Sequence, residues 1–249
     1  PHCMFLSHIE RALIKGDTSG ATYGPIEFVP VAFSGSPQLL SERVDLDACI
    51  TTVSPMDRHG WFTFGTSNDY TSTAARRARR LIVEVNPAMP RVFGDSLLHV
   101  SEVDSIVESH RDAPFYDFID DNPAFHSLPV NIVNDPRHIA KNDNVVSVNG
   151  TLQVDLGGAC NSEHLLGRQY SGSGGQLDFV RGATASKGGK SIIACQSTAL
   201  GGTVSRIVPV LDGPVTTPRN DTHIVVTEYG WADLKGKSMH QRADALIGL

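Results

Sequence analysis

Residues 170–198, with the sequence YSGSGGQLDFVRGATASKGGKSIIACQST, limit the possible folds of this chain more than any other segment. Two glycine-rich turns, at 172–175 and 187–190, flank a short amphipathic stretch at 176–183, and the apolar run 192–195 follows the second turn. Glycine permits the tight turns that join a helix to neighbouring strands. We therefore expect a short helix or turn at 176–183 and a central strand at 192–195, the arrangement of an α/β domain.

The same turns suggest a site for a ligand. Glycines let the backbone pass close to a ligand, and successive free N–H groups form a concave site for anions or for a developing oxyanion. Arg181, Lys187 and Lys190 add positive charge around these turns. On the residues alone, a site for a phosphorylated or acyl ligand and two ordinary turns of an α/β domain both remain open.

Strands and helices are expected to alternate along the rest of the chain. Short apolar runs that are rich in β-branched residues and bounded by turn formers predict buried strands. These strands are expected at 27–33, 48–53, 81–85, 97–100, 130–133, 145–149, 153–155, 205–210 and 223–227. A helix is expected at 71–80, and another at 239–247 with Ser238 as its N-cap. The alternation predicts two α/β halves, each with a parallel or mixed sheet covered by helices.

Composition and charge argue against several classes of protein. Of the 249 residues, 40% are hydrophobic and 19% are charged, which is typical of a soluble globular protein. The net charge of −6 argues against a nucleic-acid-binding surface, and no run reads as a membrane span or a signal peptide. The four cysteines are scattered and expected to be reduced, and no Cys or His spacing predicts a zinc site. We therefore expect a cytoplasmic protein with no metal, no membrane partner and no nucleic acid.

Five segments resemble one enzyme family, in the family's own order. They are SPMDRHGWFTFGTS at 54–67, VNPAMPRVFGDSLLHVSEVDSIVE at 85–108, YDFIDDNPAFHSLPVNIVNDP at 116–136, the glycine-rich block at 170–198 and VVTEYGWADLKGKS at 225–238. Together they resemble the acetyl-CoA hydrolase / 4-hydroxybutyrate CoA-transferase family, a branch of the CoA-transferase superfamily. The resemblance implies two related CoA-transferase-like domains, at 1–111 and 112–249, with the active site in the cleft between them. Domain pairs of this kind often form dimers, so a homodimer is expected.

The reaction that the resemblance implies moves CoA between short-chain carboxylic acids, such as 4-hydroxybutyrate, acetate, butyrate, succinate or itaconate. A glutamate carboxylate attacks the thioester carbonyl of an acyl-CoA to give a mixed anhydride, and the CoA thiolate then converts this into a glutamyl-CoA thioester. The second acid reverses these steps. Each addition builds an oxyanion that backbone N–H groups can stabilise. Coenzyme A is the implied co-substrate, and no metal is required.

The resemblance also assigns roles to residues of the glycine-rich block and to Asn134. The N–H of Gly175 is the first choice of oxyanion donor, and the side-chain amide of Asn134 is the second. The residues expected to bind CoA are Gly172, Ser173, Gly174, Gln176, Lys187 and Lys190. The two lysines could equally be solvated turn residues.

The expected nucleophile is missing from the chain. In the family that this sequence resembles, a long block lies between the segments that end at residue 108 and begin at residue 116, and it carries the attacking glutamate. Here only SHRDAPF, at 109–115, joins them. The first part of the N-terminal half is likewise expected to lie before Pro1. Either the printed sequence omits these residues or the protein lacks them. We favour omission, because a fold rarely survives the loss of internal strands from its core.

Other candidate groups have simpler interpretations. Glu228 follows a predicted strand, where α/β sites form, but we expect it to pair with a buried cation or to cap the next turn. Glu102 is expected to be structural or to line the cleft, and Asp57 with His59 to shape a turn beside the cleft. Three alternatives to the transferase stay open: an acyl-CoA hydrolase, a catalytically inactive CoA-binding protein if the block is deleted, and a sugar-phosphate isomerase-like enzyme.

Overall fold

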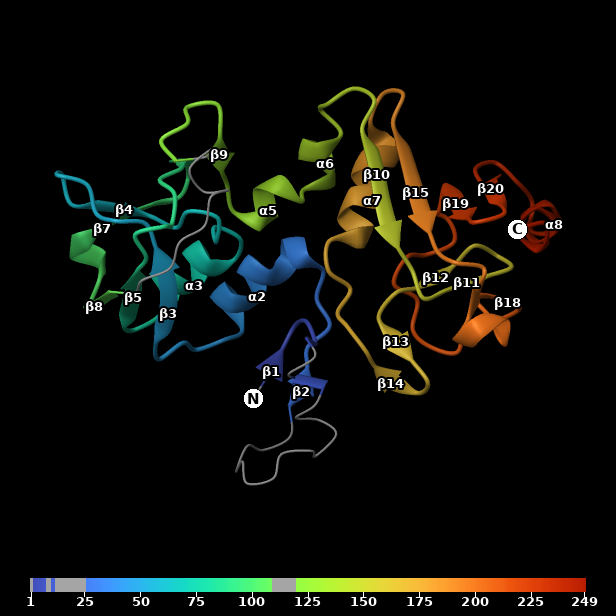
Figure 1. The fold of residues 1–249 in the computed structure, drawn as a ribbon, viewed down its shortest axis with the longest axis horizontal. Helices are drawn as coiled ribbons and strands as arrows, with labels where there is room; N and C mark the ends of the chain where they lie inside the picture. The colour runs from blue at the N-terminus through green and yellow to red at the C-terminus, as the bar shows by residue number, and fades with distance from the viewer. Residues whose placement is uncertain (1, 8–9, 12–25, 109–119) are drawn as a thin grey trace. The chain divides into compact units, whose positions relative to one another are not determined.

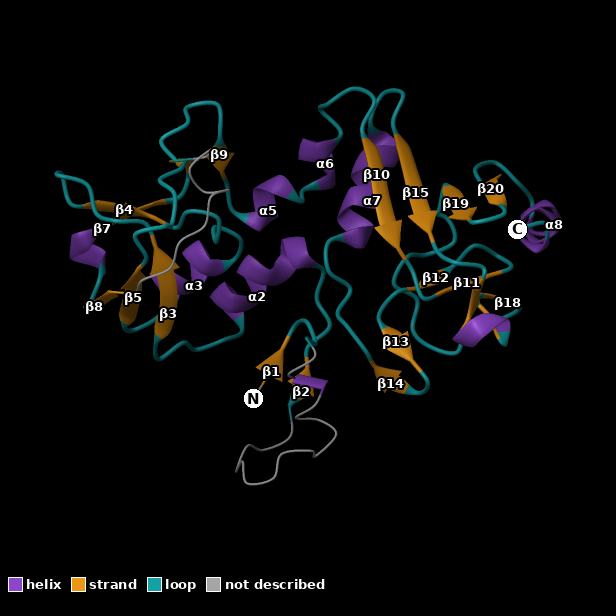
Figure 2. Cartoon of the chain, viewed as in Figure 1, coloured by secondary structure: helices purple, strands orange, loops and turns teal. Residues whose placement is uncertain are grey.

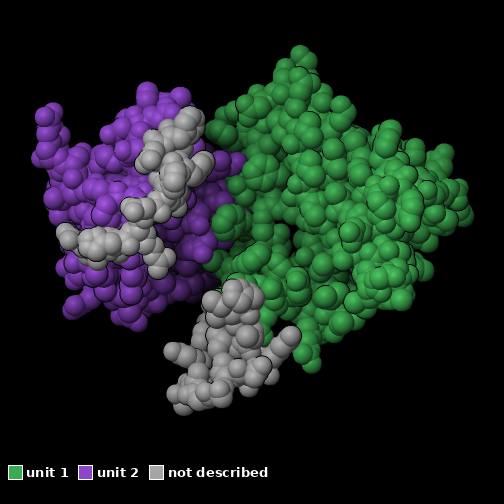
Figure 3. Space-filling model, viewed as in Figure 1, with its two compact units in different colours: residues 1–33, 134–249 green, residues 34–133 purple. Residues whose placement is uncertain are grey.

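The computed structural model describes residues 2–7, 10–11, 26–108 and 120–249 (Figure 1). The chain divides into two compact units, one of residues 34–133 and one of residues 1–33 with 134–249, coloured purple and green in Figure 3. Both units combine strands with short helices (Figure 2), and the predicted α/β fold with parallel and mixed sheets is confirmed. The predicted domain boundary at 111/112 and the whole joining segment 109–115 lie outside the described residues.

The unit of residues 34–133 is built on a three-stranded parallel sheet. Its strands are β3 (Cys49–Val53), β5 (Leu81–Val85) and β8 (Ser105–Glu108), in the order β3-β5-β8. The helix α3 (Thr71–Arg77) packs on β3, and α2 (Ser36–Glu42) packs on α3. The smaller elements are β4 (Trp61–Thr63) paired with β7 (Leu97–His99), β6 (Phe93–Gly94) paired with β9 (His126–Ser127), a 3-10 turn at Val100–Glu102 and α5 (Val130–Val133).

The other unit centres on a four-stranded mixed sheet of order β10-β15-β19-β20. The strands β10 (Val146–Gly150), β15 (Lys190–Ala194) and β19 (Ile224–Thr227) are parallel, and β20 (Gly230–Asp233) returns antiparallel to β19. The helix α7 (Gln176–Ala185) packs on β10 and β15, where Val180 joins a buried core with Ile193 and Val225.

Two further helices belong to this unit. The short helix α6 (Pro136–Ile139) packs on α7, and α8 (Met239–Ile247) contacts β20. Ser238 caps α8 as predicted, because its hydroxyl accepts the N–H of Gln241. None of the helices in the described part of the chain is long and apolar enough to cross a bilayer.

Shorter strands complete the unit. The strand β11 (Gln153–Asp155) pairs with β12 (Cys160–Asn161) and β18 (Ile207–Val208), and β13 (His164–Leu165) forms a hairpin with β14 (Arg168–Gln169). The remaining pairs are β16 (Thr198–Ala199) with β17 (Val204–Ser205), and β1 (His2–Cys3) with β2 (Glu27–Phe28). Two more 3-10 turns lie at Phe33–Gly35 and Leu200–Gly202.

One predicted strand is a helix. The sequence predicts a strand at 130–133, but the structure has α5 there. A four-residue apolar run is too short to show a helical or strand period. The carbonyl of Pro129 accepts the N–H groups of Ile132 and Val133, which closes a helical turn.

Other predicted elements are shorter than expected. The run 27–33 forms a strand only at Glu27–Phe28, because Pro30 has no N–H to donate to a strand ladder. The helix predicted at 71–80 ends at Arg77, since Ala78 is extended with ψ of 146°. The strand predicted at 205–210 is divided between β17 and β18.

One face of each main sheet is open to solvent. On β10, Val146 and Val148 are 58% and 65% exposed, and on β3, Ile50 is 73% exposed. Parallel strands are usually covered by helices on both faces. Each unit, in its described residues, therefore has an apolar sheet face that is not fully covered.

Candidate functional site

The predicted glycine-rich turn leads directly into α7. The strand β14 ends at Gln169, and residues 170–175 bring the chain to the helix, for which Gly175 is the N-cap residue. No side chain of the described chain caps this end of α7. The first N–H groups of a helix lack intrahelical acceptors and lie at the positive end of the helix dipole. The turn therefore presents donors that suit an anion or a developing oxyanion.

The structure brings the two predicted oxyanion donors together. A Cβ atom on Gly175 would lie 2.4 Å from Nδ2 of Asn134, well inside contact distance. Only glycine therefore fits at position 175 while the amide keeps its place. Asn134 is 8% exposed, so its side chain is buried beside the first turn of α7.

Asn134 is positioned by the helix that follows it. The Asp135 carboxylate accepts the N–H of Arg137 at 2.8 Å and so caps α6. Hydrogen bonds from the Arg137 side chain lower the pKa of Asp135 to about 2, so the cap stays ionised near neutral pH. Because α6 packs on α7, this cap fixes Asn134 against the glycine-rich turn.

The middle of the turn is held by the N-terminal part of the chain. The Ser173 hydroxyl donates to the carbonyl of Val31 at 2.9 Å, and the N–H of Phe33 donates to the carbonyl of Gly174 at 3.0 Å. Gly174 has a φ of +56°, which favours glycine. The Ser173 hydroxyl is thus already bonded within the protein.

Two other residues predicted to bind CoA are packed inward. Gln176 is 8% exposed, and its Nε2 donates to Oγ1 of Thr217 at 2.9 Å. A Cβ atom on Gly172 would lie 2.3 Å from the carbonyl oxygen of Met4, so this glycine permits a close approach of two backbone segments. A contact of CoA with either residue stays a prediction.

The two predicted lysines lie at the other end of α7. With ten residues, the helix is about 15 Å long, and Lys187 and Lys190 follow its C-terminus. The Lys187 side chain is 88% exposed and lies 3.8 Å from the carboxylate of Asp143. Arg181, in the middle of the helix, pairs with Asp221 at 3.0 Å. The positive charge expected around the two turns therefore lies in the middle of α7 and after its C-terminus.

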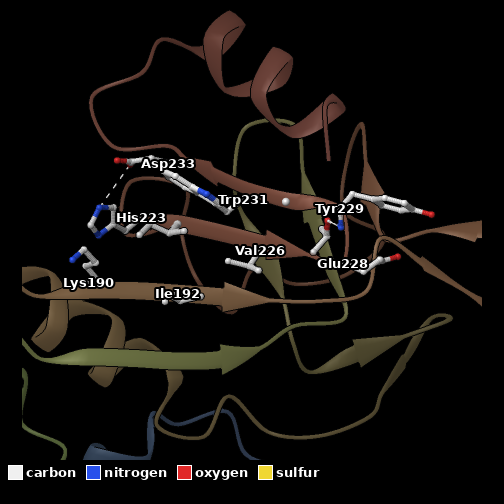
Figure 4. A pocket seen from close by; sticks show the side chains of 11 residues that line it. Lys190, Ile192, His223, Val226, Glu228, Tyr229, Trp231 and Asp233 are labelled. Carbon is white, nitrogen blue, oxygen red and sulfur yellow. Dashed lines mark hydrogen bonds and ion pairs between the residues drawn. The ribbon is translucent and has the colours of Figure 1, made fainter.

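Lys190 instead lines a hollow on the open face of the β10-β15-β19-β20 sheet (Figure 4). The hollow has a volume of about 630 Å³ and is lined, among others, by Lys190, Ile192, His223, Val226, Glu228, Tyr229, Trp231 and Asp233. Nε2 of His223 lies 3.7 Å from Oδ1 of Asp233. Burial lowers the pKa of His223, although Asp233 opposes this shift, so the ring is neutral at pH 7.

Glu228 lines the same hollow, but its carboxylate is bonded within the fold. It accepts the N–H of Ser197 at 2.8 Å and the Ser197 hydroxyl at 2.6 Å. These bonds lower the pKa of Glu228, and the bond from the Ser197 hydroxyl has the larger effect. Glu228 was expected to pair with a buried cation or to cap the next turn. Among the described residues, its carboxylate does neither. Glu228 instead ties the loop after β15 to the end of β19.

The turn-forming residues of the other unit behave as expected. Oδ1 of Asp57 accepts the N–H groups of His59 and Trp61, both at 2.9 Å, and shapes the turn before β4. The N–H of His99 donates to the carboxylate of Glu102 at 3.0 Å, which gives that glutamate a structural role. Within the described ranges, no group of three or more His, Cys, Asp or Glu side chains is placed to hold a metal ion.

Sequence reasoning missed one buried acid beside the turn. Glu163 is 7% exposed, and its carboxylate accepts hydrogen bonds from Thr216 and Gln169. No motif marks it, because Thr216 lies 53 residues away in the chain.

Comparisons with known proteins cover nearly the whole chain. Residues 10–115 match the acetyl-CoA hydrolase/transferase N-terminal domain, and residues 112–249 match the C-terminal domain of the same family. A succinyl-CoA:cyclohexane-1-carboxylate CoA transferase from Geobacter metallireducens is 34% identical, over 98% of this chain and 76% of that protein. A 4-hydroxybutyrate coenzyme A transferase from Clostridium kluyveri is 36% identical, over 91% of this chain and 75% of that protein. The crystal structure of RipA from Yersinia pestis superposes with a TM-score of 0.90 and 43% identity, over 99% of this chain and 77% of that chain.

The alignment with the Geobacter protein also locates a difference in length. It spans 338 positions, whereas this chain has 249 residues, so at least 89 aligned positions have no residue here (338 − 249 = 89). Because the alignment covers 98% of the chain, these positions are internal to the aligned region.

Proposed function

Because this chain belongs to the acetyl-CoA hydrolase/transferase family, we propose that it binds acyl-CoA and takes part in moving CoA between short-chain carboxylic acids. The relatives named above are CoA transferases that act on carboxylic acids. The observation that carries the proposal is the meeting of Gly175 and Asn134 at the first turn of α7.

In the proposed reaction, a glutamate carboxylate attacks the thioester carbonyl of the acyl-CoA and the carbonyl oxygen becomes an oxyanion. The oxyanion collapses, the C–S bond breaks, and CoA leaves as a thiolate. The thiolate then attacks the glutamyl carbonyl of the anhydride and releases the first acid, which leaves a glutamyl-CoA thioester. The N–H of Gly175 and the amide of Asn134 are proposed to donate to the oxyanion at these additions.

By resemblance to the family, the attacking glutamate belongs to a block expected between residues 108 and 116, which the printed sequence does not contain. The two glutamates beside the described sites do not replace it. Glu163 is 7% exposed and bonded to neighbouring side chains, and the lowered pKa of Glu228 makes its carboxylate a weaker nucleophile. Turnover therefore requires the missing block, and a chain without it is proposed to bind acyl-CoA without transferring CoA.

An intact mass measurement followed by a transfer assay separates these cases. A mass that matches 249 residues, with no acetyl-CoA formed from butyryl-CoA and acetate, would support an acyl-CoA-binding protein without turnover. A larger mass, with transfer and with a glutamate that borohydride reduces only after acyl-CoA treatment, would support the covalent transferase. Release of free CoA without a second acid would point to the hydrolase. A protein that neither turns over nor binds acyl-CoA would contradict the proposal.

The assembly and location expected from the sequence are also proposals. The family's two domain matches adjoin at residues 112–115, which supports domains at 1–111 and 112–249. We propose a cytoplasmic homodimer, on the composition and on the resemblance. Analytical ultracentrifugation of the purified protein tests the dimer, and a monomer at micromolar concentration would contradict it.

A further inference from the structure

The buried carboxylate of Glu163 bonds to the segment that leads into the glycine-rich turn. Its Oε2 accepts Nε2 of Gln169 at 3.0 Å, and the same Gln169 nitrogen donates to the carbonyl of Ser171 at 2.7 Å. Gln169 therefore bridges the carboxylate to the backbone of the turn. With Glu163 only 7% exposed, water cannot easily take the place of either bond.

The backbone of Glu163 holds the same segment from the other side. Its carbonyl accepts the N–H of Tyr170 at 2.7 Å and the N–H of Ser171 at 3.0 Å. One residue thus fixes two N–H groups of this segment through its main chain, and its side chain holds the Gln169 amide that donates to the Ser171 carbonyl.

A second bond of the carboxylate connects the beginning of the turn to its end. Oε1 of Glu163 accepts the hydroxyl of Thr216 at 2.9 Å. The next residue, Thr217, accepts Nε2 of Gln176 at 2.9 Å, and Gln176 is the first residue of α7. The two ends of the turn are therefore fastened to two adjacent threonines, the beginning to Thr216 through Glu163 and the end to Thr217 through Gln176.

No cation pairs with Glu163 among the described residues, where its carboxylate has two neutral donors. The side chain therefore acts through the geometry of these hydrogen bonds. We propose that Glu163 is a positioning residue that sets the turn at 170–175 and so aims the N–H of Gly175 at its ligand. The claim that the Gly175 N–H is aimed at a ligand rests on the proposed function.

Two variants of Glu163 separate geometry from charge. In Glu163→Gln, the amide oxygen can accept Gln169, and the amide nitrogen can donate to Thr216, because a hydroxyl both donates and accepts. Glu163→Ala removes both bonds. A third variant, Gln169→Leu, removes the bridge from Glu163 to Ser171 but leaves the bond between Glu163 and Thr216 in place. It keeps the test usable should Glu163→Ala fail to fold.

The amide NMR spectra of the ¹⁵N-labelled protein test the positioning directly. We expect the resonances of Gly172, Gly174 and Gly175 to stay in place in Glu163→Gln and to shift or broaden in Glu163→Ala and Gln169→Leu. A Glu163→Ala protein that melts earlier but keeps these resonances would show a merely structural role and overturn the proposal. A Glu163→Gln protein that is disturbed as much as Glu163→Ala would also overturn it, because the charge would then matter.

Titration with acetonyl-CoA, a non-hydrolysable ketone analogue of acetyl-CoA, tests the link to the ligand. In the parent protein the Gly175 amide should shift on binding. We expect Glu163→Gln to bind within about threefold of the parent and Glu163→Ala to bind about tenfold more weakly. If the parent's Gly175 amide does not respond, the proposed function fails at this turn, whereas the spectra of the free proteins still decide the role of Glu163. Equal binding by Glu163→Ala would contradict the aiming of Gly175.

Discussion

At the scale of single residues, the contact between Gly175 and Asn134 decides whether the proposed site can form. The two residues lie 41 positions apart, and their contact leaves room for a side chain at 175 only if the Asn134 amide moves. A donor that is fixed by packing needs no reorganisation when charge develops on a ligand. The buried amide of Asn134 is therefore more useful to an oxyanion than a solvated one would be.

The substitution Gly175→Ala tests this contact. The added Cβ would lie 2.4 Å from Nδ2 of Asn134, so the amide must move and the proposed oxyanion site would lose one of its donors. We expect binding of acetonyl-CoA, measured by calorimetry, to weaken by at least about tenfold. Gly150→Ala is the matched control, since a Cβ there has nothing within 4 Å. Equal binding by both variants would remove Gly175 and Asn134 from the site.

Only part of this residue-level detail could be predicted from the sequence. Ser238 was predictable as a cap because its partner lies three residues away. Gly175 and Asn134 came from the family resemblance, and the sequence alone would not have paired them. Glu163 could not be predicted, because burial and hydrogen bonds from distant residues define its role.

At the scale of the elements, the packing of α6 on α7 supports the site. A Cβ atom on Gly182 of α7 would lie 2.6 Å from both Cβ and Cγ2 of Ile139 at the end of α6. The helices approach closely only because residue 182 has no side chain. Asn134 lies two residues before α6, so this approach also holds the amide near the turn.

The substitution Gly182→Ala sets helix propensity against packing. Alanine in a helix interior is favoured over glycine by about 1 kcal/mol, whereas overpacking a core costs about 1–3 kcal/mol. We expect packing to prevail and the free energy of unfolding in urea to fall. The loss should be smaller when Ile139 is already Ala, which makes a double-mutant cycle the control. A more stable Gly182→Ala protein would mean that α6 does not pack this closely.

The elements show why local patterns predict some structures and not others. The helix α7 has flanking glycines and ten residues, enough for its pattern to be recognised. The four residues of α5 are apolar and lie after Pro129, and such a run suits a strand or a helical turn equally. The sequence predicts a short helix or turn between the two glycine-rich turns, and α7 does separate Lys187 and Lys190 from the first turn.

At the scale of the whole chain, both main sheets have an exposed apolar face. The sequence predicts parallel strands but not their exposure, because exposure depends on which segments cover the strands. At least 89 positions of the aligned relative have no counterpart here, so covering segments of that protein can be absent from this one. Exposed apolar faces favour association with other apolar surfaces.

The double substitution Val146→Thr with Val148→Thr tests the consequence for association. Both side chains are more than half exposed. We therefore expect the double variant to bind less of a hydrophobic fluorescent dye and to scatter less light from associated protein, with little change in the free energy of unfolding. Ile193→Thr is the control on the buried face of the same sheet, where Ile193 is 0% exposed and the substitution should destabilise the protein. Unchanged scattering in the double variant would mean that this face does not drive association.

Three glycines at seven-residue intervals, Gly175, Gly182 and Gly189, determine how far α7 can vary. A Cβ atom would lie 2.4 Å from Asn134 at the first, 2.6 Å from Ile139 at the second and 2.1 Å from the carbonyl oxygen of Ala183 at the third. In a saturation library selected for folded protein, positions 182 and 189 should keep glycine, whereas Gly150 should accept substitution. In an engineered library of this domain, residues on the open face of the strands can therefore be varied, whereas residues on the buried side of α7 can hardly be varied.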